Sequence, residues 1–198
     1  MKCPYEPRLF GVGYLGDGRH NGSMNKKGTK CYNIWSGMMK RAYDPKYIQN
    51  RPTYKDCIVS EEWHNFQNFS DWFQSNYYEI EGERMALDKD ILYKGNKMYS
   101  PNTCIFAPTR INTLFIKCDE CRGDLPVGVT YKNKKYVARC RINTKLKHLG
   151  YYDTPQEAFQ VYKNFKENYI KEVAEEYKKK IPTKLYNALI TYEVEIDD

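Results

Sequence analysis

The sequence predicts an α+β protein in which a mixed helical core is followed by a three-stranded antiparallel sheet packed on one long helix. In the first half, residues 32–43 and 60–76 carry apolar side chains at helical spacing. In the second half, residues 135–142 alternate in the manner of a half-buried strand. A long amphipathic segment follows Pro155. The change in periodicity along the chain indicates two structural regions.

The first region is expected to hold two core helices behind a loop-rich arm. The arm is rich in Gly, Asn and Lys, and only residues 9–15 in it are expected to form a short strand. The helix over residues 32–43 has its apolar residues on one face, with Lys40 and Arg41 opposite. For the helix over residues 60–76, Ser60 is the expected N-cap, because a serine oxygen there can accept from a free backbone amide.

The second region is expected to contain three strands, over residues 127–131, 135–142 and 145–152. Successive side chains of a strand point to opposite faces. The middle strand therefore has one predicted buried face and one basic face. The buried face holds Tyr136, Ala138, Cys140 and Ile142, and the other holds Val137, Arg139 and Arg141.

A long helix is predicted to start at Thr154 and Pro155 and to run toward Lys180. Thr154 is the expected N-cap, and Glu157 three residues later completes a capping box. Pro182 ends this helix, and residues 184–190 form a short one behind it. The apolar stripe of the long helix is expected to pack on the sheet, or alternatively to join two copies into a homodimer.

The positive charge is concentrated in the second region. The chain has a net charge of +7. Between Arg122 and Gly150 there are eight basic residues and one acidic residue, Asp124. The charge of this segment, 8 − 1 = +7, equals the net charge of the whole chain. Such a surface favours a polyanion as partner, because phosphates neutralise it. The alternative is a lysine-rich face that only water covers.

Membrane insertion, secretion and a zinc site are not expected. No apolar run reaches the roughly 20 residues of a membrane span, and the amino terminus lacks the apolar stretch of a signal peptide. A cytoplasmic protein is the resulting expectation. Among the seven cysteines, only Cys118 and Cys121 are spaced as CxxC, whereas zinc sites usually have two such pairs.

The order of residues 87–112 is that of a small metal site. Asp88 lies on a short apolar-flanked strand, a polar loop follows, and a second strand over residues 104–106 leads to a helix-like run with Asn112. We expect two strands and a helix to hold one metal ion there.

Residues 128–162 resemble the Apetala-two/ethylene-response-factor DNA-binding fold over about 35 residues. The matching features are Gly128-Val129, Tyr136-Val137-Ala138, Leu149-Gly150-Tyr151-Tyr152-Asp153-Thr154, Glu157-Ala158 and Tyr162. The resemblance implies a sheet that lies in the major groove of double-stranded DNA, backed by one helix. His148 departs from the plant pattern, which commonly has an aromatic residue there.

A basic strand can read DNA, because arginine reaches guanine edges in the major groove. Arg139 and Arg141 are expected to contact bases or phosphates, and the lysines to contact the backbone. The outward residues of the sheet are expected to include Tyr131, Lys135 and His148. The full candidate set is Tyr131, Lys132, Lys134, Lys135, Arg139, Arg141, Lys145, Lys147 and His148. The alternative is a small sheet that recognises RNA or protein.

Residues 87–112 also resemble the His-Asn-His nuclease motif, the ββα-metal finger of phage homing endonucleases. In that pattern an acidic residue ends the first strand, a general-base histidine follows it, an asparagine holds the loop, and a helix residue completes the metal site. Asp88 matches the acid, Asn102 lies near the loop position, and Asn112 matches the last ligand. Lys89 stands where the histidine is expected.

The resemblance implies a phage-encoded, Mg²⁺-dependent DNA endonuclease or nickase in the host cytoplasm, with Asp88, Lys89 and Asn112 as catalytic residues. Asp88 and Asn112 would hold the Mg²⁺ ion, with Asp90 as a further ligand, and its other positions would remain for water and phosphate. The nuclease-like region would span residues 1–120 and the DNA-binding region residues 121–198. A lysine with its ordinary pKa of ~10.4 is protonated at neutral pH, so it binds a phosphate more readily than it accepts a proton. Two alternatives remain: a DNA-binding regulator with a degenerate nuclease fold, and a protein in which Asp88 only caps a turn and the sheet is an interaction surface.

Overall fold

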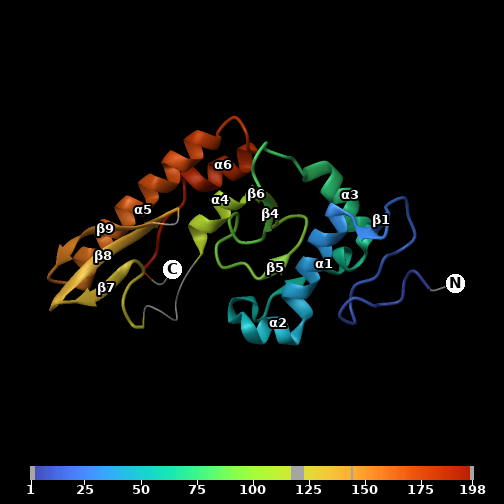
Figure 1. Cartoon of the computed structure of the whole chain (residues 1–198), viewed down its shortest axis with the longest axis horizontal. Coiled ribbons are helices and arrows are strands. Elements are labelled where there is room, and N and C mark those ends of the chain that lie inside the picture. Colours follow the sequence, from blue (N-terminus) through green and yellow to red (C-terminus); the bar gives the residue numbers. More distant parts are fainter. Residues whose placement is uncertain (1–2, 117–122, 144, 197–198) are drawn as a thin grey trace. The chain divides into compact units, whose positions relative to one another are not determined.

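The computed structural model describes residues 3–116, 123–143 and 145–196. They form a mixed α+β structure in two compact units, Met1–Ala107 and Pro108–Asp198, named here the first and the second unit (Figure 1). The predicted boundary between residues 120 and 121 lies outside the described residues, as do Cys118 and Cys121.

The first unit combines three α-helices with short strands and 3₁₀ turns in its described part. In chain order the elements are β1 (Ser23–Met24), β2 (Lys27–Gly28), α1 (Lys30–Tyr43), α2 (Pro45–Asn50), η1 (Pro52–Tyr54), β3 (Ile58–Val59), η2 (Glu61–His64), α3 (Phe66–Asn76), β4 (Met85–Asp88), β5 (Met98–Tyr99) and β6 (Ile105–Pro108). The predicted strand over residues 9–15 is absent there: Leu9 and Gly13 form only an isolated bridge, and so do Tyr14 and Asn65.

Helix α1 confirms the predicted helix over residues 32–43 and supplies one wall of the core. Its N-cap is Thr29, whose side chain accepts from the backbone amide of Tyr32. Trp35 is fully buried, and its indole Nε1 donates to the carbonyl oxygen of Trp63 at 2.7 Å. The side chains that fill this core are Trp35, Met38, Met39, Ala42, Cys57, Val59, Trp63, Phe66, Phe69, Tyr99 and Cys104.

The helix predicted over residues 60–76 is broken, and its predicted N-cap is wrong. A 3₁₀ helix, η2, comes first, and α3 begins only after Asn65, whose side chain accepts from the amide of Gln67 at 3.0 Å. Ser60 makes no capping hydrogen bond, and its hydroxyl is buried without a partner among the described residues. The break lets the carbonyl oxygen of Trp63 meet α1, because an uninterrupted helix would have used that oxygen internally.

Two short strand pairs lie beside the helices and position the candidate metal loop. β3 and β5 pair in parallel, with Val59 opposite Tyr99. β4 and β6 form a second two-stranded sheet. β4 ends at Asp88, so the loop from residue 89 to β5 begins there. β6 is fully buried along its length.

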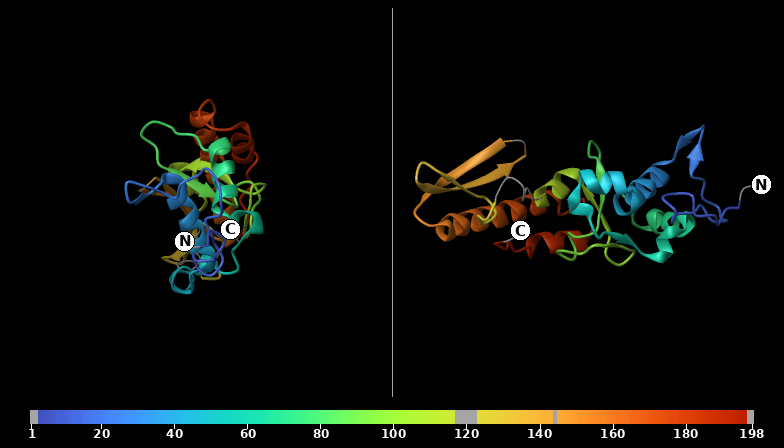
Figure 2. Two further views of the ribbon diagram at one scale, coloured as in Figure 1. Left: turned by 90° about the vertical axis from the view of Figure 1, so that its right-hand side faces the viewer. Right: turned by 90° about the horizontal axis from the view of Figure 1, so that it is seen from below.

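The second unit confirms the predicted sheet and its helix. Its described elements are α4 (Thr109–Asn112), η3 (Thr113–Phe115), β7 (Val129–Lys132), β8 (Lys135–Ile142), β9 (Lys145–Tyr152), α5 (Pro155–Tyr177) and α6 (Thr183–Ile190). The strand order is β7-β8-β9, antiparallel throughout. The sheet lies along one side of α5 (Figure 2).

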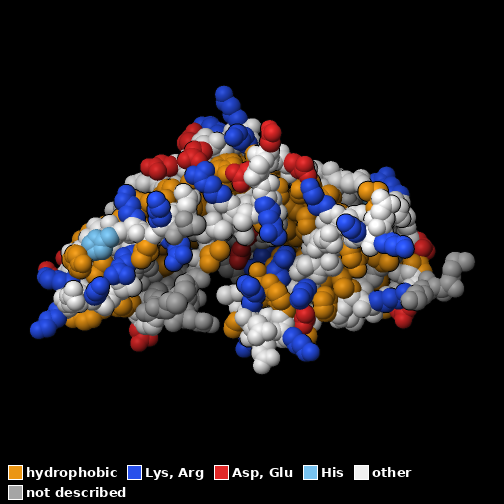
Figure 3. All heavy atoms as spheres, viewed as in Figure 1, with side chains coloured by type: hydrophobic (Ala, Val, Ile, Leu, Met, Phe, Trp, Pro, Cys, Tyr) orange, Lys and Arg blue, Asp and Glu red, His pale blue; other side chains and the backbone are white. Residues whose placement is uncertain are grey.

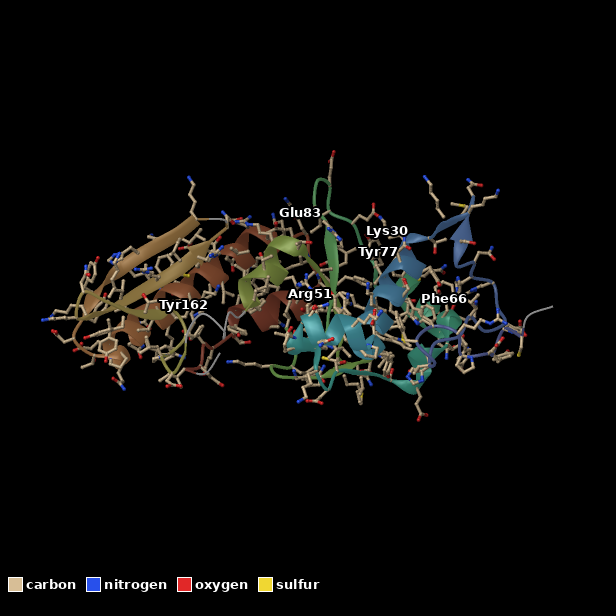
Figure 4. The ribbon with its side chains drawn as sticks, turned by 60° about the horizontal axis from the view of Figure 1, so that its bottom comes forward. Lys30, Arg51, Phe66, Tyr77, Glu83 and Tyr162 are labelled. Carbon is tan, nitrogen blue, oxygen red and sulfur yellow. The ribbon has the colours of Figure 1, made fainter. Side chains whose placement is uncertain are left out.

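Helix α5 has the predicted capping box at Thr154 and Glu157. Along its apolar stripe, Ala158, Tyr162, Tyr169, Ile170 and Val173 are buried. Tyr162, labelled in Figure 4, lies against Gly128 so closely that a Cβ there would come within 2.1 Å of the tyrosine ring. Gly128 also has a positive φ of 74°, a conformation that glycine adopts without strain. These two residues of the matched segment therefore fix how the helix seats on the sheet.

Candidate functional site

The Asp88 carboxylate forms the turn that starts the candidate metal loop. Its Oδ1 atom accepts from the backbone amides of Asp90 and Ile91, both at 2.8 Å. Because β4 ends at Asp88, strand alternation does not govern the direction of Lys89. Asp88 is thus the last residue of β4.

Lys89 is a buried cation that belongs to the loop. Its side chain is only 8% exposed. The ammonium Nζ donates to Oδ2 of Asp90 and to the carbonyl oxygen of Asn96, both at 2.9 Å. It also lies 5.8 Å from the ring centroid of Tyr99. A buried charge needs such partners, because burial without them is very costly. The amine is therefore engaged in fixing the loop.

Asn96 closes the same loop. Its Nδ2 donates to the carbonyl oxygens of Lys89 at 2.6 Å and Met98 at 2.7 Å, and its Oδ1 accepts from the amide of Met98 at 3.2 Å. Asn96 therefore bridges the two ends of the loop. Asn102, which we placed near that position, is exposed. The signal for Asn96 was its place in a Gly-Asn turn, which by itself predicts only the turn.

The environment of Asp88 disfavours its charge. Burial and, to a smaller extent, the neighbouring Asp90 carboxylate raise the pKa of this carboxyl to about 6, against the two backbone amides, which lower it. A cation placed beside both carboxylates would reverse this effect.

The first unit offers carboxylate oxygens to a hard cation. Asp88 keeps Oδ2 beside its amide-bound Oδ1, and Asp90 lies close enough to change the pKa of Asp88. Such a donor pair fits Mg²⁺ with water in its other positions. No group of three or more His, Cys, Asp or Glu side chains suited to a metal occurs among the described residues. Asn112 lies on α4 in the second unit, so its predicted sharing of an ion with Asp88 stays a prediction.

Two residues near the loop were not among our candidates. Arg41 donates from Nε to the hydroxyl of Tyr99 at 3.0 Å, and its guanidinium lies 5.4 Å from the ring centroid of Tyr99. In the sequence, Arg41 lay on the polar face of a predicted helix, and nothing distinguished it from a solvated arginine there.

The second candidate site is the face of the β7–β9 sheet that points away from α5, named here the outer face. Arg139 on β8 pairs with His148 on β9, and Arg141 pairs with Leu146. Ala138 precedes Arg139, and Cys140 lies between the two arginines; both belong to the core against α5. Figure 3 shows Lys and Arg side chains gathered over these strands.

The arginines of the outer face are not neutralised within the described residues. Arg141 is exposed, and neither guanidinium makes a hydrogen bond or ion pair with a described side chain. The Nε atom of Arg139 is buried and has no partner there. His148 is exposed, and its ring lies 4.6 Å, between centroids, from that of Tyr151. Arg141 is thus open to an outside acceptor, whereas Arg139 is half-buried.

Three other candidates lie toward the helix. Tyr131 pairs with Tyr136, which packs on the core against α5, so the prediction that Tyr131 points outward is wrong. Lys147 pairs with the buried Cys140, and its ammonium lies 4.6 Å from the ring centroid of Phe165 on α5.

Lys145 likewise pairs with Ile142, on the helix-facing side. Lys132 and Lys135 face each other across β7 and β8, and Lys135 forms an ion pair with Asp153. Lys134 has a positive φ in the turn between these strands. Val137, predicted on the basic face, is fully buried, so the outer face is not open to solvent at this position.

No family model matches the chain, and no curated protein or solved structure matches it either. Among the described helices, none combines the length and the apolar character that a membrane span requires.

The raised pKa of Asp88 predicts a specific pH dependence of stability. In metal-free buffer, the folded state binds the Asp88 proton more tightly than the unfolded state, whose ordinary pKa is 3.8. The contribution of Asp88 to the free energy of unfolding is therefore fully present below about pH 4 and is lost as the pH rises through about 6. Asp88→Asn keeps the oxygen that accepts the two amides and removes the charge, so it should stabilise the first unit at pH 7 by on the order of 2 kcal/mol.

Urea unfolding followed by tryptophan fluorescence measures this effect, because Trp35, Trp63 and Trp72 all lie in the first unit and are the only tryptophans of the chain. The difference between variant and wild type should grow from near zero at pH 4 to its full value at pH 7. Asp17→Asn, at an exposed aspartate of the same unit, is the matched control. Parallel pH profiles for wild type and Asp88→Asn would contradict the assignment.

Proposed function

We propose that this protein binds double-stranded DNA through the outer face of its three-stranded sheet. The observation that carries the proposal is the pair Arg139 and Arg141, which lie on one side of β8 without an acidic partner among the described residues. Guanidinium groups bind phosphates and guanine edges bidentately. A helix-backed sheet of this size has the dimensions to enter the major groove of B-DNA.

The division of charge between the two faces supports DNA over a merely solvated surface. On the helix-facing side, Lys147 lies over an aromatic ring of α5. On the outer side, Lys135 is paired with Asp153, whereas Arg139 and Arg141 have no acidic partner in the described part. The exposed guanidinium of Arg141 is therefore free to bind a phosphate.

A second candidate function is phosphodiester hydrolysis at Asp88, delivered to DNA by the sheet. The favouring observation is that Asp88 and Asp90 lie together at the end of β4 with the loop fixed around them. When bound, Mg²⁺ would stabilise charge on the phosphoryl oxygens and lower the pKa of a bound water. Asp88 and Asp90 would hold the ion, and Lys89 would position Asp90. The alternative, a DNA-binding regulator without cleavage, has the same sheet and an inactive loop.

The sheet is tested by removing the two outer charges. Arg139→Ala with Arg141→Ala should weaken duplex binding and reduce the slope of log affinity against log salt by up to about two. With each phosphate contact that is lost, binding releases fewer counterions from the DNA. Fluorescence anisotropy with a labelled duplex at several salt concentrations measures both quantities.

The matched control is Lys145→Ala with Lys147→Ala, which removes the same charge from the helix-facing side of the same sheet. It should change the slope much less. A duplex RNA of the same sequence should bind more weakly, since its deep, narrow major groove excludes a sheet. Unchanged DNA binding in the Arg139/Arg141 variant, or an equal loss in the control, would contradict the proposal.

Cleavage is tested by nicking of supercoiled plasmid carrying DNA from the source genome, with Mg²⁺ or Mn²⁺. Wild type should nick, and Asp88→Asn should lower the rate by at least 10²-fold while DNA binding stays intact, since the turn is preserved and the ligand charge is lost. Full nicking by Asp88→Asn would place the catalytic site elsewhere. Binding without nicking by the wild type would favour the regulator.

A further inference from the structure

Three tyrosines of the first unit each hold a cation against the ring. The guanidinium of Arg41 lies 5.4 Å from the centroid of Tyr99 and 6.0 Å from that of Tyr54. The centroids of Tyr47 and Tyr54 are 5.8 Å apart. Tyr47 itself contacts the two cations Lys40, at 5.2 Å, and Arg51, at 5.6 Å.

These cations are fixed in place without being neutralised. Lys40 and Arg51 are exposed, and neither they nor Arg41 form an ion pair with a described acid, whereas Lys30 in the same unit is paired with Glu79. Figure 4 labels Arg51, where α2 ends. Cation–π contacts orient a side chain and leave its full charge for an outside anion.

The ring that anchors Arg41 does not cancel its charge. Tyr99 is 2% exposed, and burial raises its pKa above the ordinary value, against the nearby Arg41. Its hydroxyl is therefore neutral at physiological pH, and it accepts from Nε of Arg41. No described residue accepts a hydrogen bond from the remaining nitrogens of that guanidinium, and none of these atoms is buried without a partner.

The chemistry of this arrangement selects phosphates over bases. The ring faces of Tyr47, Tyr54 and Tyr99 are already engaged by cations, so they do not form an open platform for base stacking. What the surface presents is an array of orientated positive charges, which matches the phosphate backbone of a nucleic acid. Figure 3 shows Lys and Arg side chains gathered over α1 and α2.

We propose that Lys40, Arg41 and Arg51, held by Tyr47, Tyr54 and Tyr99, form a second DNA-contacting surface that binds backbone phosphates without sequence preference. We name it the cation–tyrosine surface. The inference rests on the proposed function in one respect, the identity of the polyanion as duplex DNA. It assigns to the first unit an affinity of its own for the DNA that the sheet binds.

The test uses the full chain and a labelled mixed-sequence duplex at several salt concentrations. Lys40→Gln with Arg51→Gln removes the two exposed charges and spares Arg41, whose bond to Tyr99 supports the core. Binding should become roughly tenfold weaker, and the salt slope should fall by up to about two. Lys40→Arg with Arg51→Lys keeps both charges and should bind like wild type.

The matched control is Lys26→Asn with Lys27→Gln, which removes two exposed charges from the β1–β2 hairpin of the same unit and should leave binding unchanged. Asparagine suits position 26, where φ is positive. Equal binding by the Lys40/Arg51 variant and this control would overturn the inference. A loss in the charge-preserving variant would also overturn it, because packing rather than charge would then be responsible.

Two comparisons separate this inference from the proposed function. If Arg139→Ala with Arg141→Ala binds DNA like wild type while Lys40→Gln with Arg51→Gln does not, the sheet proposal fails and the cation–tyrosine surface stands. Vesicles of phosphatidylserine and phosphatidylcholine test for a membrane partner. If Lys40→Gln with Arg51→Gln loses vesicle binding and keeps DNA binding, the DNA assignment is overturned.

Discussion

The buried ammonium of Lys89 is the constraint on which the candidate metal loop depends. A cation that is 8% exposed must be compensated locally, and the loop supplies Asp90 and the carbonyl oxygen of Asn96 for that purpose. Asn96 then binds the carbonyl oxygen of Lys89 in return, so the cation and the loop hold each other. The cost of leaving any of these groups unpaired explains why the turn at Asp88 has a single defined geometry.

The same constraint decides which neighbouring groups remain available. Lys89 neutralises Asp90, whereas Asp88 accepts from two backbone amides and has a raised pKa. Arg41 is anchored by a neutral hydroxyl and keeps its charge. The first unit therefore combines a carboxyl group that favours a cation with an arginine that favours an anion, and a phosphodiester with a bound metal ion has both kinds of charge.

In the second unit, packing on α5 separates two kinds of basic residue. Gly128 and Tyr162 seat the helix on the sheet, and the bulge in the pairing of β8 with β9 comes between Ala138 and Arg139. Lys147 points to the helix side and covers Phe165 with its ammonium. Arg139 and Arg141 point away from it. The pairing register of β7, β8 and β9 thus places some basic residues on the helix-facing side of the sheet and others on the outer face.

The sequence predicted those features that local periodicity and capping determine. The three strands, the capping box at Thr154 and the helix α1 were all predicted, because alternation and capping act over a few residues. The break at Asn65 was missed, since an apolar stripe continues through η2 and α3 while the hydrogen bond from Trp35 to Trp63 depends on tertiary packing.

Within the candidate sites, Asp88 was identified from its place in a motif, whereas Asn96, Arg41 and the inward direction of Tyr131 were not. The partners of Asn96 and Arg41 are set by loop closure and by contacts between distant segments, as between Arg41 and Tyr99. Tyr131 depends on the pairing register with β8, which alternation in one strand does not give.

The most direct measurement of the central claim is an NMR titration of isotope-labelled full-length protein with a mixed-sequence DNA duplex at low salt. We expect the guanidinium signals of Arg139 and Arg141 to shift on binding, since these groups gain acceptors, while the side-chain signals of Lys147 stay in place. Shifts at Lys147 with unchanged signals from both arginines would contradict the claim that the outer face of the sheet is the DNA interface.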